Sequence, residues 1–168
     1  MPRRVSRMKI KRVVGDLIEI PTSKGLAYVQ HIFDHKIPPV YGSLIRVLQG
    51  FYKTTPSKEE LQKIVALPHR FVGFCPVYHA IKAGIFKLIG NFPVPEFARK
   101  FPVFKATQAP PKSDPKEVDW WLWDGEKEWK VGKLSEEDLD KYPYRGVFND
   151  TALITSIETG MFCKRKLC

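Results

Sequence analysis

The sequence predicts a single α+β domain, made mainly of antiparallel strands in a small barrel-like or curved sheet, with two short helices. Three observations support this fold class. The chain has 168 residues, which is enough for one sizeable hydrophobic core. Several short segments alternate polar and apolar residues and are separated by turn residues, a pattern typical of meandering strands. Two segments begin with a serine that is expected to cap a helix, Ser57 and Ser135.

The first part of the chain predicts three strands. Residues 16–34 are expected to form a hairpin, because DLIEIP and LAYVQHIFDH each alternate with a period of two. Gly25 lies between them and can adopt a positive φ, as a hairpin turn requires. After two prolines, residues 42–53 read GSLIRVLQGFYK, whose β-branched and aromatic character predicts a third strand.

A first helix is expected to begin after Ser57. The stretch TPSKEELQKIVAL supplies Ser57 as the N-cap and Glu60 three residues later, which is the capping-box pattern, and Pro68 ends the helix. Its apolar stripe is predicted to consist of Leu61, Ile64 and Val65.

The middle of the chain predicts two core strands and a loop. Residues 70–81 and 84–95 are apolar and aromatic, with glycines that mark bends, and a helix around residues 79–83 is the alternative. Residues 101–115 contain four prolines and predict an irregular surface loop.

The last third predicts a second hairpin, a second helix and a closing strand. Residues 119–132 read DWWLWDGEKEWKVG, with Asp124 and Gly125 at or near the turn. Ser135 is expected to cap the acidic helix SEEDLDKY, whose carboxylates lie in the first turn, where the helix dipole favours them. Residues 151–160, TALITSIETG, are expected to form the last strand.

The net charge of +10 comes mostly from the two ends of the chain. We divide the sequence into a basic N-terminal arm (residues 1–13), one domain (residues 14–163) and a basic C-terminal tail (residues 164–168). The ends are expected to be solvated. The alternative is that the arm binds nucleic-acid phosphates without sequence preference, through Arg3, Arg4, Arg7, Lys9, Lys11 and Arg12.

The charge of the domain itself is polarised along the sequence. Residues 14–112 hold 13 bases and 6 acids, whereas residues 113–163 hold 6 bases and 12 acids. If the second group shares one face, that face attracts a cationic partner and speeds its association.

Cysteine usage and hydropathy predict a soluble cytoplasmic protein with no membrane contact. The three cysteines, Cys75, Cys163 and Cys168, are an odd number without a close pair, which favours neither a disulfide framework nor a Cys-rich zinc site. The N-terminus has bases but no apolar leader segment after them. No stretch reaches the roughly 18 consecutive apolar residues of a membrane-spanning helix.

No catalytic residue, metal or cofactor is expected. His31 and His35 are four residues apart on a predicted strand, which separates them by about 13 Å, too far for one zinc ion. Cys75 and His79 share an apolar neighbourhood, where a thiol is more commonly inert than activated. The sequence contains neither the GxxxxGK[ST] motif nor the GxGxxG motif, the two glycine-rich loops that commonly bind phosphate.

The most distinctive segment is residues 119–129, which contains all four tryptophans among charged residues. On a strand, Trp121 and Trp123 share one face and Trp120 takes the other. One interpretation is that these side chains only pack. The other is that an exposed tryptophan rimmed by carboxylates is a hot spot for a partner, with candidate residues Asp119, Trp120, Asp124, Glu126, Glu136, Glu137 and Asp138.

Three stretches, VGDLIEIPTSKGLAYVQHIF, KLIGNFPVP and DWWLWDGEKEWKVGKLSEEDLDKYP, together resemble the Imm26 family of bacterial immunity proteins over residues 13–150. A departure is Phe86, which stands where we expect the family to carry tryptophan. The resemblance implies a mainly β domain, made by a cell that carries a polymorphic toxin, which neutralises the cognate toxin by direct binding and has no catalytic residues.

Three functional hypotheses follow. In the first, the chain is an immunity protein that occludes a toxin through its acidic, tryptophan-bearing C-terminal third. In the second, it is a nucleic-acid-binding small β-barrel that uses the basic arm. In the third, it is a hydrolase that uses Cys75 and His79.

Overall fold

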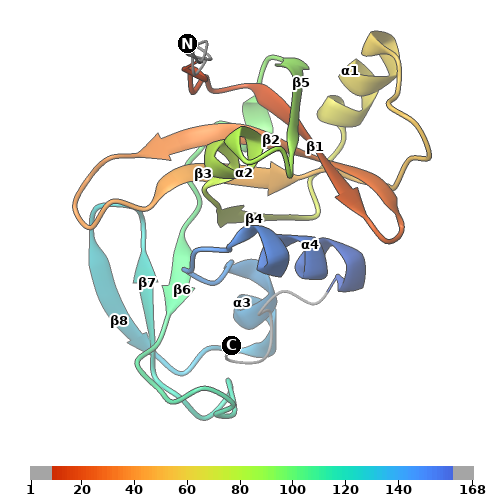
Figure 1. Cartoon of the computed structure of the whole chain (residues 1–168). Coiled ribbons are helices and arrows are strands. Elements are labelled where there is room, and N and C mark those ends of the chain that lie inside the picture. The colour runs from red at the N-terminus through yellow and green to blue at the C-terminus, as the bar shows by residue number, and fades with distance from the viewer. Residues whose placement is uncertain (1–8, 161–168) are drawn as a thin grey trace, which may run out of the picture.

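The computed structural model describes residues 9–160 and confirms the α+β class (Figure 1). A five-stranded antiparallel sheet has the order β4-β3-β2-β1-β5, with β1 (Asp16–Thr22), β2 (Gly25–His35), β3 (Gly42–Val47), β4 (Phe71–Phe74) and β5 (Lys87–Asn91). A second antiparallel sheet has the order β6-β7-β8, with β6 (Phe104–Ala106), β7 (Trp120–Trp123) and β8 (Glu128–Gly132). The described residues also form α1 (Lys58–Ala66), α2 (Val77–Lys82), α3 (Glu136–Lys141), α4 (Asp150–Thr159) and the 3-10 turn Glu96–Ala98.

The first hairpin is confirmed, with Thr22 paired to Gly25 at its end. Gly25 has φ of +120°, and an added Cβ would lie 2.9 Å from the Tyr52 carbonyl oxygen, so both its conformation and its surroundings require glycine. The third strand is shorter than predicted and ends at Val47. After it, Tyr52 returns to form an isolated bridge with Leu26.

Helix α1 forms as predicted, because both capping-box bonds are present. The Glu60 backbone N–H donates to Ser57 Oγ at 3.2 Å, and the Ser57 N–H donates to Glu60 Oε2 at 2.8 Å. The predicted stripe of Leu61, Ile64 and Val65 is buried.

The strand predicted over residues 70–81 is wrong beyond Phe74, where the alternative helix is found instead as α2. Pro76 is the reason, since it has no N–H for a strand ladder and suits the residue before a helix. The strand expected within residues 84–95 is present as β5, but it is an outer strand with exposed ends and not a core strand.

The predicted loop over residues 101–115 contains the buried strand β6, so that prediction is wrong for residues 104–106. The second hairpin is confirmed as β7 and β8, and the acidic helix as α3, with Asp138 N donating to Ser135 Oγ at 3.1 Å. A register shift in β7 lies between Trp120 and Trp121.

The closing strand is also wrong, because residues 150–159 form α4. The Ala152 N–H donates to the Asn149 side chain at 2.7 Å, which caps the start, and Gly160 ends the helix at φ of +65°. Leu153 and Ile157 are fully buried four residues apart, the spacing of a helical face. With α2 and α4, the described residues contain two more helices than the two expected.

The five-stranded sheet is covered on both faces (Figure 1). On one face, Ile18 and Ile45 pack with side chains of α2 and α4, and on the other, Leu17 and Tyr28 pack with the stripe of α1. The smaller sheet joins the body through Trp123, which packs with rings from β4 and β6. Within residues 9–160, none of the helices has the length and apolar character needed to cross a bilayer.

Candidate functional site

The thiol and imidazole of the hydrolase hypothesis lie in different environments. Cys75 is 2% exposed, whereas His79 lies on the exposed side of α2. Burial, and secondly the charge of Asp150, raises the pKa of the Cys75 thiol to about 12, the opposite of an activated nucleophile. Cys163 and Cys168 lie outside the described residues.

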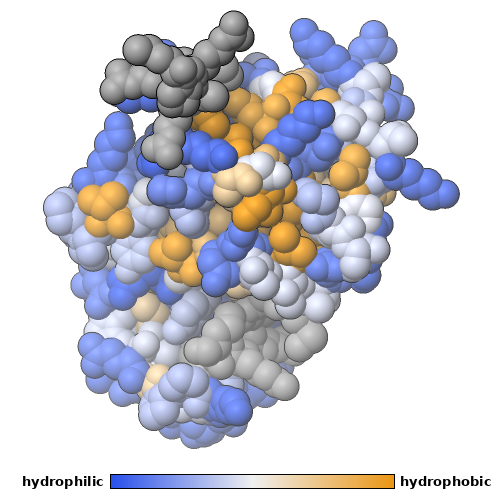
Figure 2. All heavy atoms as spheres, in the orientation of Figure 1, coloured by the Kyte–Doolittle hydropathy of each residue, from blue (hydrophilic) through white to orange (hydrophobic). Residues whose placement is uncertain are grey.

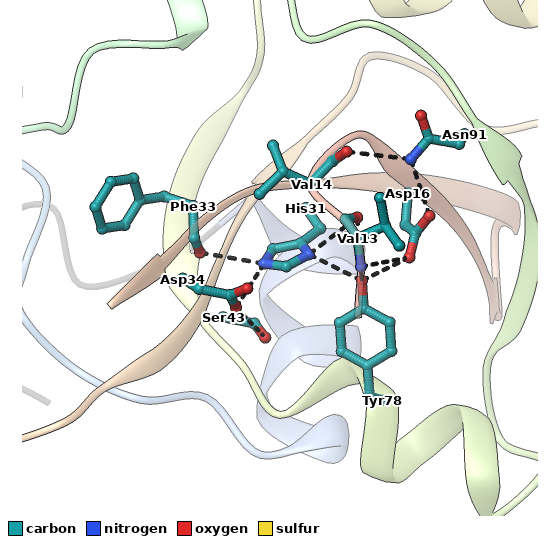
Figure 3. A network of polar contacts seen from close by, with 9 residues as sticks. All are labelled: Val13, Val14, Asp16, His31, Phe33, Asp34, Ser43, Tyr78 and Asn91. Carbon is teal, nitrogen blue, oxygen red and sulfur yellow. Dashed lines mark hydrogen bonds and ion pairs between the residues drawn. The ribbon is translucent and has the colours of Figure 1, made fainter. Parts of the chain in front are cut away.

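His31 is buried in a polar network that ties the start of the domain together (Figure 3). Its Nε2 lies 2.9 Å from Asp34 Oδ1 and 3.2 Å from the Phe33 carbonyl oxygen, and since both atoms are acceptors, Nε2 carries a proton. Its Nδ1 lies 2.8 Å from the Tyr78 hydroxyl, which donates to Asp16 Oδ2 at 2.7 Å. Both ring nitrogens of His31 and the Tyr78 hydroxyl are thus paired inside the fold.

His35 links the end of β2 to the second hairpin by a hydrogen bond. Its Nε2 donates to the Gly125 carbonyl oxygen at 2.7 Å, and its Nδ1 accepts from the Tyr41 N–H at 3.2 Å. Among residues 9–160, no group of three or more His, Cys, Asp or Glu side chains is arranged to hold a metal ion.

Trp120 was predicted to contact a partner, and its burial contradicts this. It is 1% exposed and packs with Leu139 and Tyr144, and its Nε1 donates to the Pro115 carbonyl oxygen at 2.8 Å. Trp129 is the exposed tryptophan instead, at 41%, on the outer strand β8. Trp129, and not Trp120, is therefore the exposed tryptophan of this hairpin.

The predicted carboxylates are split between the two ends of β7. Asp124 and Glu126 lie in the β7–β8 turn, where Asp124 accepts from the backbone N–H groups of Glu126 at 3.0 Å and Lys127 at 2.8 Å. These two backbone hydrogen bonds lower the pKa of Asp124. The turn is thus held together by the Asp124 carboxylate.

The other predicted carboxylates lie at the start of β7 and on α3, and two of them are paired. Asp119 Oδ2 lies 3.2 Å from Lys130 Nζ, and Glu136 pairs with Lys116. The side chains of the other two, Glu137 and Asp138, are exposed and partly exposed in the first turn of α3.

The turn carboxylates border a cleft of about 310 Å³ between the end of β2 and the β7–β8 turn. Asp34, Asp124 and Glu126 line it with one base, Lys36, so its charge is acidic. Its apolar walls are Phe33, Ile37 and Phe101.

A glycine and a histidine hold this cleft in shape. Gly125 has φ of +100°, and a Cβ there would lie 2.9 Å from Phe101 Cε1, so only glycine fits the turn against this wall. The hydrogen bond from His35 to the Gly125 carbonyl fixes the distance between the two sides.

Of the basic arm, Arg3, Arg4 and Arg7 lie outside the described residues. Lys9, Lys11 and Arg12 are exposed, but the residues between and after them belong to the packed body. Ile10 packs against the main core cluster, and the Val13 N–H donates to Asp16 Oδ2 and to the Tyr78 hydroxyl, both at 3.2 Å.

Comparison with protein-family models, with curated proteins and with solved structures found no match to this chain.

Sequence reasoning missed the β2 side of the acidic cleft. Phe33 near the end of β2 is 39% exposed, and Ile37 just after the strand is 44% exposed, although most of β2 is buried. The signal was present, since large apolar residues beside Asp34 and Lys36 break the alternation at the strand end.

Proposed function

We propose that this chain is an immunity protein that binds a cognate bacterial toxin and neutralises it by occlusion, without catalysis. Under this proposal it works in the cytoplasm of the cell that carries the toxin. Its resemblance to the Imm26 family supports the proposal. The observation that carries it is the β7–β8 hairpin, which offers an exposed tryptophan on an outer strand and an acidic cleft at its turn.

The outer strand supplies an anchor for a protein partner. β7 is the only hydrogen-bonded neighbour of β8 within the described residues, so the other side of β8 is free to pair with an added strand. Trp129 and Val131 are 41% and 38% exposed on this strand. A partly exposed tryptophan is the residue type most enriched in binding hot spots.

The cleft at the β7–β8 turn favours a cationic side chain of the partner. Its apolar walls suit the aliphatic stem of a lysine or arginine, and its carboxylates suit the cationic head. The surrounding surface of the smaller sheet, in the lower part of Figure 2, is mostly hydrophilic. A toxin surface that is cationic and inserts one lysine or arginine side chain would match both the acidic cleft and the hydrophilic surface around it.

The test is a binding titration between the purified chain and the toxin protein encoded beside its gene, together with protection of cells that express the toxin. Trp129→Ala is expected to weaken the complex about 30-fold or more, the effect of losing a hot spot. Leu88→Ala is the matched control, since Leu88 is 37% exposed on the outer strand β5 of the other sheet.

A second pair of variants tests the cleft. Glu126→Gln removes one exposed carboxylate at its mouth and is expected to weaken and slow association, with less salt dependence than the native chain shows. Glu59→Gln removes an exposed carboxylate on α1 as a control. Absence of both a complex and protection with the native chain would refute the proposal.

The alternative function, nucleic-acid binding through the basic arm, has one structural observation in its favour: Lys9, Lys11 and Arg12 are exposed where the chain enters the body. It predicts retention on DNA or RNA at low salt that is lost when Lys9, Lys11 and Arg12 are replaced by glutamine. These substitutions spare Ile10 and Val13, which hold the start of the described chain to the body.

A further inference from the structure

A second hollow in the described surface carries the opposite charge to the acidic cleft. It is a groove of about 500 Å³ lined mainly by residues 69–72, by residues 97–103 and by residues 140–144 at the end of α3 and after it. Figure 1 labels β4 and α3, which contribute to this lining. Arg70, Lys100 and Lys141 line it against a single carboxylate, Asp140. An anion is therefore the favoured kind of ligand.

The walls of this groove are aromatic. Phe97 is 54% exposed, unusually open for a large apolar side chain, and the His69 ring lies beside it with centroids 6.2 Å apart and planes inclined by 31°. Arg46 Cζ lies 5.6 Å from the Phe97 ring centroid, so this ring is held in place by a buried cation. The remaining rings around the groove are Phe71, Phe101, Tyr142 and Tyr144.

Two buried polar atoms beside the groove have no hydrogen-bond partner among the described residues: His69 Nδ1 and Arg70 Nη1. Arg70 is anchored by its other nitrogen, since Nη2 donates to the Ile157 carbonyl oxygen at 3.0 Å. Burial, and secondly the charge of Arg46, lowers the pKa of His69. Both atoms are buried, so they lie behind the surface of the groove, where they add polar character and, with Arg70, positive charge.

We propose that this groove binds a nucleotide, with its base against Phe97 and its phosphate at Lys100, Lys141 and Arg70. Stacking on aromatic rings and pairing with cations are the two contacts that a nucleotide offers together. The volume lies in the range of small-molecule sites. The chemistry is the same for a free nucleotide and for one unit of a single strand. Phe101 lines both hollows, but the residues proposed to contact the nucleotide, Phe97, Lys100, Lys141 and Arg70, are not among those proposed to bind the toxin, so either proposal can fail alone.

The test is calorimetric titration of the full chain with ATP, GTP and AMP, and separately with adenosine and inorganic triphosphate. Nucleotides are expected to bind at least about tenfold more tightly than either fragment. Lys100→Gln/Lys141→Gln is expected to weaken nucleotide binding about tenfold or more. The control, Lys82→Gln/Lys87→Gln, makes the same change of charge on exposed residues outside the groove and is expected to bind as the native chain does.

A third variant and an oligonucleotide complete the test. Phe97→Ala is expected to weaken nucleotide binding about tenfold while leaving binding of triphosphate unchanged. Binding of a single-stranded oligonucleotide alone, lost in the same variants, would assign the site to nucleotides within a strand. Absence of binding to every nucleotide and strand, equal affinity for triphosphate and ATP, or equal loss in the control variant would overturn the proposal.

Discussion

The buried thiol of Cys75 leads to a quantitative prediction about alkaline stability. The folded chain holds the pKa of this thiol at about 12 instead of 9.0, mainly because the side chain is buried. Between these two values the folded state binds the proton and the unfolded state releases it, so the free energy of unfolding falls as the pH rises above about 9. Integrated to about pH 10, this single group removes about 1.4 kcal/mol of stability relative to neutral pH.

Urea unfolding of the native chain and of Cys75→Ala, each at neutral pH and at about pH 10, isolates this contribution. The variant is expected to lose about 1.4 kcal/mol less than the native chain between the two conditions. Other alkaline titrations cancel in this comparison, including those of Tyr28 and Tyr78, whose pKa values are also raised by burial. Equal losses in the two proteins would refute the reasoning. A larger loss in the variant would point to a thiol with a lowered pKa, as a catalytic cysteine has.

Two further substitutions test the packing of the body by urea unfolding. Arg46→Met is expected to lower the free energy of unfolding by about 3 kcal/mol or more, because Gln30 Oε1 and two carbonyls at the end of α1 lose a buried charged donor. The control is Lys63→Met, on the exposed side of α1, which is expected to change the free energy of unfolding by less than about 0.5 kcal/mol. Equal effects of the two substitutions would contradict this role of Arg46. Leu153→Ala is expected to lower the free energy of unfolding by about 2–5 kcal/mol, because the leucine side chain is fully buried. Thr151→Ala, at an exposed position of the same helix, is expected to leave it nearly unchanged. A Leu153 variant as stable as the native chain would show that α4 does not pack as described.

Elements with a complete local signal could be predicted from the sequence. Helix α1 has its capping box, its stripe and its final proline within one short stretch. The first hairpin has alternation on both sides of a glycine that the turn requires. In both cases the energy that selects the structure comes from residues that are neighbours in the chain.

The missed elements are those whose local preference is overruled by packing. The β-branched residues of 151–160 favour a strand, but the Asn149 cap, Gly160 and the burial of Leu153 and Ile157 select a helix. Strand β6 is three residues long and has no local signal, and it exists because β7 lies beside it.

The candidate sites could be predicted least of all. The acidic cleft joins Phe33 and Asp34 to Glu126, which is far away in the chain, and it depends on the bond between His35 and the second hairpin. Local pattern predicted Asp124 and Glu126 as candidates, and both line the cleft, but it could not distinguish buried Trp120 from exposed Trp129. The register shift after Trp120 and the cover supplied by α3 decide that difference.

The position of α4 has a consequence for how the chain is made. Leu153 and Ile157 share one core cluster with Ile18 and Ile20 of the first strand, and Ser23 in the first turn donates its N–H to Glu158 at 3.1 Å. During synthesis the first hairpin leaves the ribosome long before α4 does. The part of its apolar face that α4 covers therefore stays exposed until residues 150–159 have emerged. The fold cannot be completed before that point, and the growing chain depends on the interval being short or guarded against aggregation.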